Sequence, residues 1–322
     1  MRYIIYGAGA IGGTIGAGLF EAGRDVVLIA RGDHGRAIKS GGLRFGTPRG
    51  GWRTLPIPVV ERPAELTIGA GDLVILAMKS QDTAGALEAL SLVAPADVPV
   101  ACAQNGVENE RLALRHFANV HGICVRMPSV YLEPGVVRVH EVESHGICDI
   151  GRYPRGLDDL DRAVAADFNA GSMLSDALDD VMALKYAKLA LNVTNVLDAA
   201  IGRDRVDPAS TTLSKRARAE ALAVFAAAGI TVSTHADPRT ASRTRVAVEG
   251  AGHAGGSAYQ SLARNTGRLE ADYLNGEVVL LGRLHGIPTP ANDALVDLAK
   301  RLIKHRTPAG SLTIADVEAG LP

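Results

Sequence analysis

Short apolar runs alternate with glycine-rich or helical stretches in the first half of the chain. Aliphatic and β-branched residues fill positions 3–6, 25–30, 72–78 and 98–103. Strands that are buried on both faces read as near-continuous apolar runs, and parallel strands need a long crossover between them. The pattern therefore predicts an α/β fold with a parallel sheet that is covered by helices.

Two further segments of this half predict other pairings. Residues 41–60 contain Gly, Pro and short β-like pieces, which we interpret as an insertion or a hairpin on the sheet. Residues 136–140 and 146–150 are mostly apolar and flank a polar turn. We therefore expect segment 135–151 to form antiparallel strands.

The second half is rich in Ala and Leu at helical spacing. The spacing predicts helices at 180–200, 212–228, 268–286 and 291–304. We therefore expect an N-terminal α/β domain over residues 1–177 and an all-helical domain over residues 178–322.

Composition and charge exclude several classes of protein. Of the 322 residues, 47% are hydrophobic and 21% are charged, which excludes a disordered tail or a collagen-like repeat. The chain has 34 Lys and Arg against 35 Asp and Glu, for a net charge of -1. This balance argues against a nucleic-acid partner.

The chain carries no clear targeting or membrane segment. No apolar run reaches the ~20 residues that span a bilayer, and the apolar start at residues 1–6 is too short for a signal peptide. The cysteines Cys102, Cys124 and Cys148 are odd in number and lack CxxC spacing, which favours reduced thiols over a disulfide or a metal site. We expect a cytoplasmic protein with neither a metal nor a membrane partner.

A dinucleotide-binding motif follows the first apolar run. It reads G-x-G-x-x-G and consists of Gly7, Ala8, Gly9, Ala10, Ile11 and Gly12. The first glycine permits a tight turn, the second lets the backbone approach a pyrophosphate, and the third lets helix and strand pack closely. With a strand before it and a helix after it, the motif predicts a Rossmann-like dinucleotide-binding domain.

The end of the second run indicates which dinucleotide is bound. NAD sites usually place a carboxylate there to hold the ribose 2′-hydroxyl, but this run ends in Arg31. A guanidinium suits a 2′-phosphate, which favours NADPH and NADP⁺. The alternative is that Arg31 is a surface residue and that Asp33 holds the ribose.

Polar residues follow the third and fourth runs. Ligands of open α/β sheets lie beyond the carboxyl ends of the strands, and Lys79 and Asn105 stand there. The ammonium can anchor a phosphate, a ribose or an anionic substrate, and the amide can hold the nicotinamide or a substrate oxygen. Each could instead end its strand facing water, but their occurrence together favours binding.

The helical half carries its own polar candidates. Lys188, Asn192 and Asn195 fall on one face at 3.6 residues per turn, on a mostly apolar segment. Buried polar groups need partners, and a substrate carbonyl and carboxylate would serve. Glu270 is a candidate to pair with Lys188 or to accept a substrate hydroxyl, and Ser257 can bind a carboxylate.

The alternatives for these residues are structural. The stripe of Lys188 and the two asparagines can be a solvent-facing polar face. Glu270 can be a carboxylate in the first turn of a helix, stabilised by the helix dipole, and Ser257 can be a loop serine.

Together these positions resemble the ketopantoate reductase (2-dehydropantoate 2-reductase) family over nearly the whole chain. The stretches that carry the resemblance are Gly7–Gly12, Leu28–Arg31, Met78–Lys79, Gln104–Gly106, Lys188–Asn192, Glu270–Gly276 and Gly286–Asn292.

The resemblance implies an NADPH-dependent reduction of a 2-keto acid to a 2-hydroxy acid, foremost of 2-dehydropantoate to pantoate in pantothenate biosynthesis. In that family the lysine matching Lys188 is the general acid, and the glutamate matching Glu270 supports it and the substrate. The asparagine matching Asn105 lies between nicotinamide and substrate. Lys79 and Asn192 match further binding positions.

The chain departs from the family at two positions that touch the substrate. The family often has an asparagine where this chain has Val196, while Asn195 stands one residue earlier, about 100° around the helix. The family's carboxylate-binding serine aligns with Ala258 or Ser257. These departures leave two alternatives to 2-dehydropantoate, namely another 2-keto acid or an imine, as in opine-type dehydrogenases.

A binding module that senses NADP without catalysis is the alternative from another class. Such a module has no use for Lys188, Asn192 and Glu270 together, so the set favours an enzyme. The oligomeric state stays open, with a homodimer as one candidate.

Overall fold

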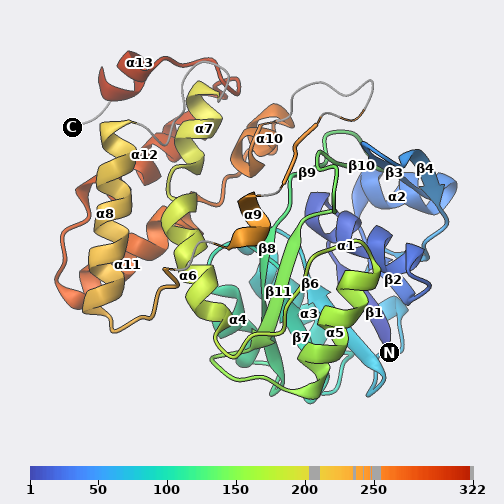
Figure 1. Ribbon diagram of the computed structural model, residues 1–322. Coiled ribbons are helices and arrows are strands. Elements are labelled where there is room, and N and C mark those ends of the chain that lie inside the picture. Colours follow the sequence, from blue (N-terminus) through green and yellow to red (C-terminus); the bar gives the residue numbers. More distant parts are fainter. Residues whose placement is uncertain (203–210, 235–236, 242, 247, 249–254, 320–322) are drawn as a thin grey trace. The chain divides into compact units, whose positions relative to one another are not determined.

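The main sheet has seven strands in the order β11-β8-β7-β6-β1-β2-β5. The computed structural model describes residues 1–202, 211–234, 237–241, 243–246, 248 and 255–319 (Figure 1). The sheet strands are β1 (Arg2–Tyr6), β2 (Asp25–Ile29), β5 (Val59–Val60), β6 (Asp72–Leu76), β7 (Val100–Cys102), β8 (Val120–Arg126) and β11 (Ile147–Arg152). All neighbours pair in parallel except β11, which is antiparallel to β8. The predicted parallel sheet is confirmed.

Helices cover both faces of this sheet because its strands carry apolar side chains on both faces. Tyr3 and Ile5 share a core with helices α1 (Ala10–Glu21) and α5 (Asp159–Ala170). Ile4 and Tyr6 point the other way, into a core with α3 (Thr83–Ser91) and α4 (Asn109–Leu114). Helix α2 (Gly32–Gly41) follows β2 and contributes Ile38 to the first core.

A second sheet corrects two expectations. Its order is β4-β3-β10-β9, from β3 (Leu43–Thr47), β4 (Gly51–Leu55), β9 (Ser129–Val130) and β10 (Val136–Val139). The hairpin expected within 41–60 forms as β3 and β4, but it belongs to this sheet rather than to the main one. Strands β10 and β11 do not pair with each other. Strand β10 alternates between half-buried and buried residues, which suits a sheet covered on one face, whereas β11 is almost wholly buried and suits the main sheet.

The chain forms two compact units. The sheet unit comprises Met1–Lys185 and the described residues between 235 and 252, and the helical unit comprises the remaining described residues. Helix α6 (Val181–Asn192) begins in the sheet unit and ends in the helical unit. The other helices of the helical unit are α7 (Asn195–Ile201), α8 (Thr212–Ala227), α10 (Ser257–Ala263), α11 (Asn275–His285), α12 (Pro290–Lys304) and α13 (Ile314–Ala319).

Of the four expected helices, two are confirmed and two need correction. Segment 180–200 is helical but breaks between α6 and α7, while 212–228 and 291–304 are confirmed by α8 and α12. The helix expected from 268 begins only at Asn275, after a short 3₁₀ turn at Ala271–Tyr273.

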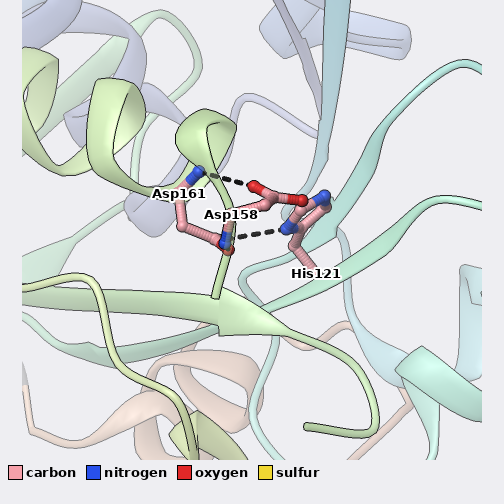
Figure 2. Close-up of side chains that lie close together, drawn as sticks. All are labelled: His121, Asp158 and Asp161. Atoms are coloured by element: carbon pink, nitrogen blue, oxygen red, sulfur yellow. Dashed lines mark hydrogen bonds and ion pairs between the residues drawn. The ribbon is translucent and has the colours of Figure 1, made fainter. Parts of the chain in front are cut away.

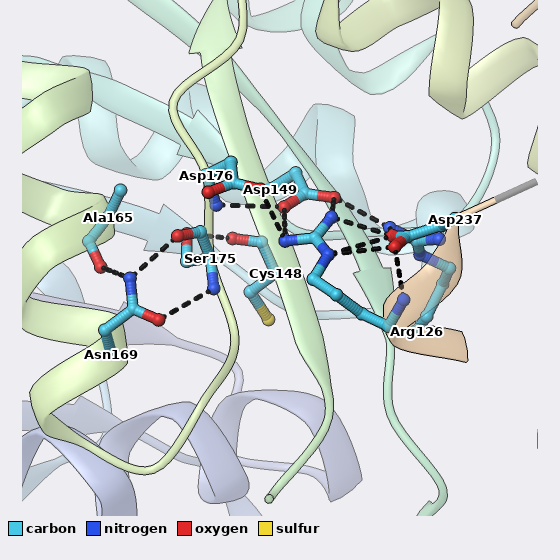
Figure 3. A network of polar contacts seen from close by, with 9 residues as sticks. Arg126, Cys148, Asp149, Ala165, Asn169, Ser175, Asp176 and Asp237 are labelled. Atoms are coloured by element: carbon cyan, nitrogen blue, oxygen red, sulfur yellow. Dashed lines mark hydrogen bonds and ion pairs between the residues drawn. The ribbon is translucent and has the colours of Figure 1, made fainter. Parts of the chain in front are cut away.

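A segment that follows α8 in the sequence returns to the main sheet. Arg239 of α9 (Pro238–Ala241) donates to both carboxylate oxygens of Asp149 in β11, at 3.0 and 2.8 Å, and pairs with Asp176 at 2.8 Å. Arg126 pairs with Asp149 and with Asp237, both at 2.7 Å. Figure 3 shows these carboxylates gathered around the arginines. The hydrogen bond from Arg239 is the main reason that the pKa of Asp237 lies well below its usual range.

Candidate functional site

Four parallel strands end side by side at one edge of the main sheet. Tyr6 is level with Ile29 of β2 and with Leu76 of β6, and Leu76 is level with Cys102 of β7. The glycine motif, Arg31, Lys79 and Asn105 each follow one of these strands. Strand order reverses at β1, and the crevice at such a switch point is where dinucleotides bind. The sheet therefore brings the predicted cofactor residues of its unit to one edge.

The three motif glycines have three different surroundings. Gly7 has a φ of +102°, and a Cβ there would lie 2.6 Å from the backbone nitrogen of Met78. A Cβ at Gly12 would lie 2.0 Å from the carbonyl oxygen of Gly7. For a Cβ at Gly9, the nearest described atom beyond the adjacent residues is a ring carbon of Tyr131, at 3.8 Å. Space beside Gly9 is what a bound pyrophosphate requires, so the cradle fits a dinucleotide.

The same turn presents backbone donors. Gly9 is the N-cap of α1, and Ala10 and Ile11 form its first turn, while Ala8 lies just before it. The first N–H groups of a helix have no partner within the helix and favour an anion.

Arg31 and Asp33 differ in what they contact. Arg31 is exposed and is the N-cap residue of α2, and its guanidinium makes no hydrogen bond or ion pair with any residue that the structure describes. Asp33 is also exposed and pairs with Arg36 on the same helix. The guanidinium of Arg31 is thus more available for a phosphate than the carboxylate of Asp33 is for a ribose.

His34 is a site residue that the sequence analysis missed. The backbone N–H of Gly135 donates to its Nδ1 at 2.8 Å, so Nε2 carries the proton and donates to the carbonyl of Ala8 at 2.7 Å. The ring is buried and lies 4.3 Å from that of Tyr131. His34 therefore ties the glycine turn to the second sheet. Its position three residues after Arg31, at the start of α2, was the signal available.

The turns after β6 and β7 are tied together. Lys79 is half-buried and precedes a 3₁₀ turn at Ser80–Asp82. The carbonyl of Asn105 accepts hydrogen bonds from Nδ2 of Asn109 at 3.0 Å and from Oγ of Ser80 at 3.3 Å. Lys79 and Asn105 therefore stand on turns that share hydrogen bonds.

The helical unit holds the other candidates. Lys188 and Asn192 are half-buried on α6, and Nδ2 of Asn192 is buried without a hydrogen-bond partner in the described part of the chain. Asn195 does not continue their face, because α6 ends at Asn192 and α7 starts at Asn195. Hydroxyl Oγ1 of Thr194, in the break, donates to the carbonyl of Leu191 at 3.1 Å.

Glu270 and Ser257 lie at helix starts in the same unit. Glu270 is buried, with 7% of its surface exposed, and precedes the 3₁₀ turn rather than lying within α11. Ser257 is half-buried and is the first residue of α10. The pairing of Lys188 with Glu270 stays a prediction, as do the roles of both residues.

Two asparagines of the resemblance stretches stabilise the helical unit. Nδ2 of Asn275 donates to the carbonyl of Val193 at 2.9 Å and to Oδ1 of Asn292 at 3.1 Å. Asn292 in turn donates to the carbonyl of Ala217 at 2.9 Å and to Glu220 at 2.8 Å. These residues connect α8, α11 and α12, so their place in the motifs is explained by packing.

A buried histidine and two aspartates lie at the opposite edge of the main sheet. Nδ1 of His121, near the start of β8, is 2.7 Å from Asp161, and Nε2 is 3.0 Å from Asn119. Asp158 and Asp161 cap the start of α5 reciprocally, and Arg152 donates to Asp158 at 2.7 Å (Figure 2). Each side chain already has protein partners, and the cluster anchors a helix start.

The three cysteines are free thiols. In the described part of the chain, no helix combines the length and the apolar character needed to cross a membrane.

Comparison with known proteins covers both halves of the chain. The model of the ketopantoate reductase PanE/ApbA family matches residues 3–155, and that of its C-terminal domain matches residues 180–303. A 2-dehydropantoate 2-reductase of Pyrococcus horikoshii is 28% identical and covers 93% of this chain and 97% of its own. One of Halobacterium salinarum is 29% identical over 93% of this chain and 98% of its own.

Solved structures agree with this match. A PanE/ApbA family ketopantoate reductase from Ralstonia eutropha JMP134 is 29% identical, covers 95% of this chain and 99% of its own, and has a TM-score of 0.77. A D-mandelate dehydrogenase with NADH and anilino(oxo)acetate has a TM-score of 0.79 at 23% identity over 95% of this chain and 99% of its own, which shows the shared fold. The chain therefore belongs to the ketopantoate reductase PanE/ApbA family, oxidoreductases that reduce 2-keto acids with a nicotinamide cofactor.

Proposed function

We propose that this chain reduces 2-dehydropantoate to pantoate with NADPH. The observation that carries the proposal is the family match over both halves, in a chain that keeps Lys188, Asn192 and Glu270. A module that only binds the dinucleotide would need none of these three.

Two features of the described residues support NADPH as the cofactor. Gly9 leaves space for a pyrophosphate, and the first turn of α1 offers it N–H groups. Arg31 would hold the 2′-phosphate, while Lys79 and Asn105 would hold other parts of the cofactor. When bound, the cofactor supplies the hydride for the carbonyl carbon.

The chain's own residues bind the keto acid and move the proton. Lys188 stabilises the negative charge that grows on the carbonyl oxygen and gives a proton from Nζ to that oxygen. Glu270 holds the lysine or a substrate hydroxyl. Asn105, Asn192, Asn195 and Ser257 orient the acid for attack, and orientation is a large part of the rate gain.

The test of the reaction follows the loss of NADPH absorbance with 2-dehydropantoate as substrate. Lys188→Ala is expected to lower kcat by about 10²–10⁴-fold, the usual contribution of a general acid, with an unchanged dissociation constant for NADPH. Lys300→Ala, at an exposed lysine of α12, is the matched control. Activity that survives Lys188→Ala would remove the general-acid assignment.

A substrate panel separates the alternatives. It contains 2-dehydropantoate, a small aliphatic 2-keto acid, phenylglyoxylate, and a 2-keto acid with an amine. Val196, which is 2% exposed where the family often has asparagine, is the residue that favours testing less polar acids. A higher kcat/KM for any other member would replace 2-dehydropantoate in the proposal.

Cofactor choice and assembly have separate tests. Arg31→Ala is expected to weaken NADPH at least about tenfold, the value of one charge-assisted contact, and to leave NADH unchanged. Tighter binding of NADH than NADPH by the wild-type protein would contradict the role of Arg31. The homodimer stays a prediction, which sedimentation velocity checks.

A further inference from the structure

Lys185 is a buried lysine on α6 that the proposed reaction does not use. Its side chain is 3% exposed and pairs with Glu110 of α4, which is fully buried. Nζ also donates to the carbonyls of Cys102 at 3.2 Å and Gln104 at 3.1 Å. An ammonium has three donors, and all three therefore go to the segment from Cys102, at the end of β7, to Glu110, in α4.

Stability alone does not explain this arrangement. Removing two charges from water is expensive, and apolar residues of similar volume often serve as well or better. Oxygen Oε2 of Glu110 has no hydrogen-bond partner among the described residues, so the pair is not even fully satisfied. Burial raises the pKa of Glu110, and Lys185 opposes that rise. Buried ion pairs of this kind are kept in some proteins because they fix one geometry.

The geometry that Lys185 fixes is the backbone on one side of Asn105. The carbonyl of Gln104, in the peptide group before Asn105, accepts from Lys185. The carbonyl of Asn105 itself, in the next peptide group, accepts from Asn109 at 3.0 Å. Both peptide groups that flank the Cα atom of Asn105 are thus held by buried side chains, which restricts its backbone angles and the direction of its side chain.

The tie also reaches the helix that carries the proposed general acid. Residues Val181–Lys185 of α6 belong to the sheet unit, and Lys188 stands one turn further along the same helix. Lys185 therefore connects the turn that carries Asn105 to the start of that helix.

We infer that Lys185, paired with Glu110, and Asn109 are positioning residues that clamp Asn105 for hydride transfer. The inference rests on the 2-keto acid reduction proposed above but not on the identity of the acid. It predicts that loss of the clamp lowers the rate of the chemical step more than it lowers cofactor affinity, because the glycine turn and Arg31 lie on other strands.

The test uses Lys185→Met and the double variant Lys185→Met/Glu110→Met. The single variant strands a buried carboxylate and is expected to melt earlier, whereas the double variant removes both charges and should recover most of that loss. Both are expected to lower kcat by about 10–100-fold, since a misplacement of about 1 Å costs on that order. The dissociation constant of NADPH should change less than kcat does, because the glycine turn and Arg31 lie on other strands.

Two further variants complete the design. Lys300→Met makes the same chemical change at an exposed ion pair and should leave kcat and melting temperature unchanged. Asn109→Asp removes the donor to the Asn105 carbonyl with little change in shape, and it should also lower kcat about tenfold or more. It carries the test if the double variant does not fold.

The assay uses whichever 2-keto acid of the panel the wild-type protein reduces. If the wild-type protein does not reduce 2-dehydropantoate, the proposed function is wrong. The clamp is tested separately, by the rates of the variants relative to the wild type. A folded double variant, or a folded Asn109→Asp protein, with wild-type kcat and KM would overturn the inference.

Discussion

Gly12→Ala should mainly lower folding stability, whereas Gly9→Ala should mainly weaken cofactor binding, although both residues belong to the same glycine turn. A Cβ at Gly12 would lie 2.0 Å from the carbonyl oxygen of Gly7 and 3.0 Å from side-chain atoms of Ala77 and Ile5. Ordinary contact begins near 3.4 Å, so α1 must move away from β1 by more than 1 Å. Overpacking of this kind costs about 1–3 kcal/mol or more, against a gain of about 1 kcal/mol for alanine in a helix.

Gly12→Ala should therefore lose about 2 kcal/mol of stability. For a domain of this size, each 1 kcal/mol shifts the melting temperature by about 2–4 °C, so the expected loss is about 4–8 °C. Gly9→Ala should melt within about 2 °C of the wild type, because Gly9 has a φ of −64° and the nearest neighbour of a Cβ would be 3.8 Å away.

For cofactor affinity, Gly9→Ala should have the larger effect of the two variants. The Cβ in Gly9→Ala occupies the space where a pyrophosphate approaches the backbone, so the dissociation constant of NADPH should rise at least about tenfold, or 1.4 kcal/mol. Scanning fluorimetry without cofactor and titration of NADPH fluorescence measure the two effects. A Gly9→Ala protein that binds NADPH like the wild type, or a Gly12→Ala protein with unchanged melting temperature, would refute the reasoning.

Two other predictions concern stability. Burial lowers the pKa of His145 from 6.5 to about 4. Between these two pH values the unfolded chain binds a proton that the folded chain does not bind. The free energy of unfolding therefore falls as the pH drops from about 6.5 to about 4, by about 3 kcal/mol at most. In His145→Phe, the free energy of unfolding measured by urea titration should depend less on pH across that range. An unchanged pH dependence would contradict the prediction. Asn292→Ala removes a donor and an acceptor from a buried cluster and should cost about 3 kcal/mol. The neighbour Asp293 has a side chain that is 45% exposed and pairs with Arg283, so Asp293→Ala should cost less than about 1 kcal/mol by the same titration, and equal losses in both variants would argue against the cluster.

Local patterns in the sequence predicted most of the sheet unit. The parallel strands and the glycine turn depend on runs of apolar residues and on glycines a few positions apart, so a short window contains the whole signal. The end of α1 was predictable for the same reason: Gly23, just after it, has the positive φ of +74° that helix ends favour.

Pairings over long distances were not predictable. Strand β10 joins β3, which lies about ninety residues earlier, and no local feature distinguishes that partner from β11. The return of Arg239 to Asp149 spans 90 residues and passes through the helical half of the sequence. Lys185 was visible only as a lysine in an apolar helix, and its partner Glu110 lies 75 residues away.

Two asparagines of the helical unit show what the structure adds to a motif. Asn292 and Asn192 both stand in stretches that carry the family resemblance, and in the sequence Asn192 differs only by its spacing from Lys188 and by its match to a family binding position. The amide of Asn292 is engaged through both its oxygen and its nitrogen within the protein, whereas Nδ2 of Asn192 is buried without a partner among the described residues. A buried donor without an acceptor costs about 1–3 kcal/mol, and chains keep such costs where function requires the group. Asn192→Leu should therefore leave stability unchanged or raised while increasing KM for the keto acid, the reverse of Asn292→Ala. An Asn192→Leu protein that is less stable than the wild type yet keeps its KM would show that Asn192, like Asn292, serves stability rather than substrate binding.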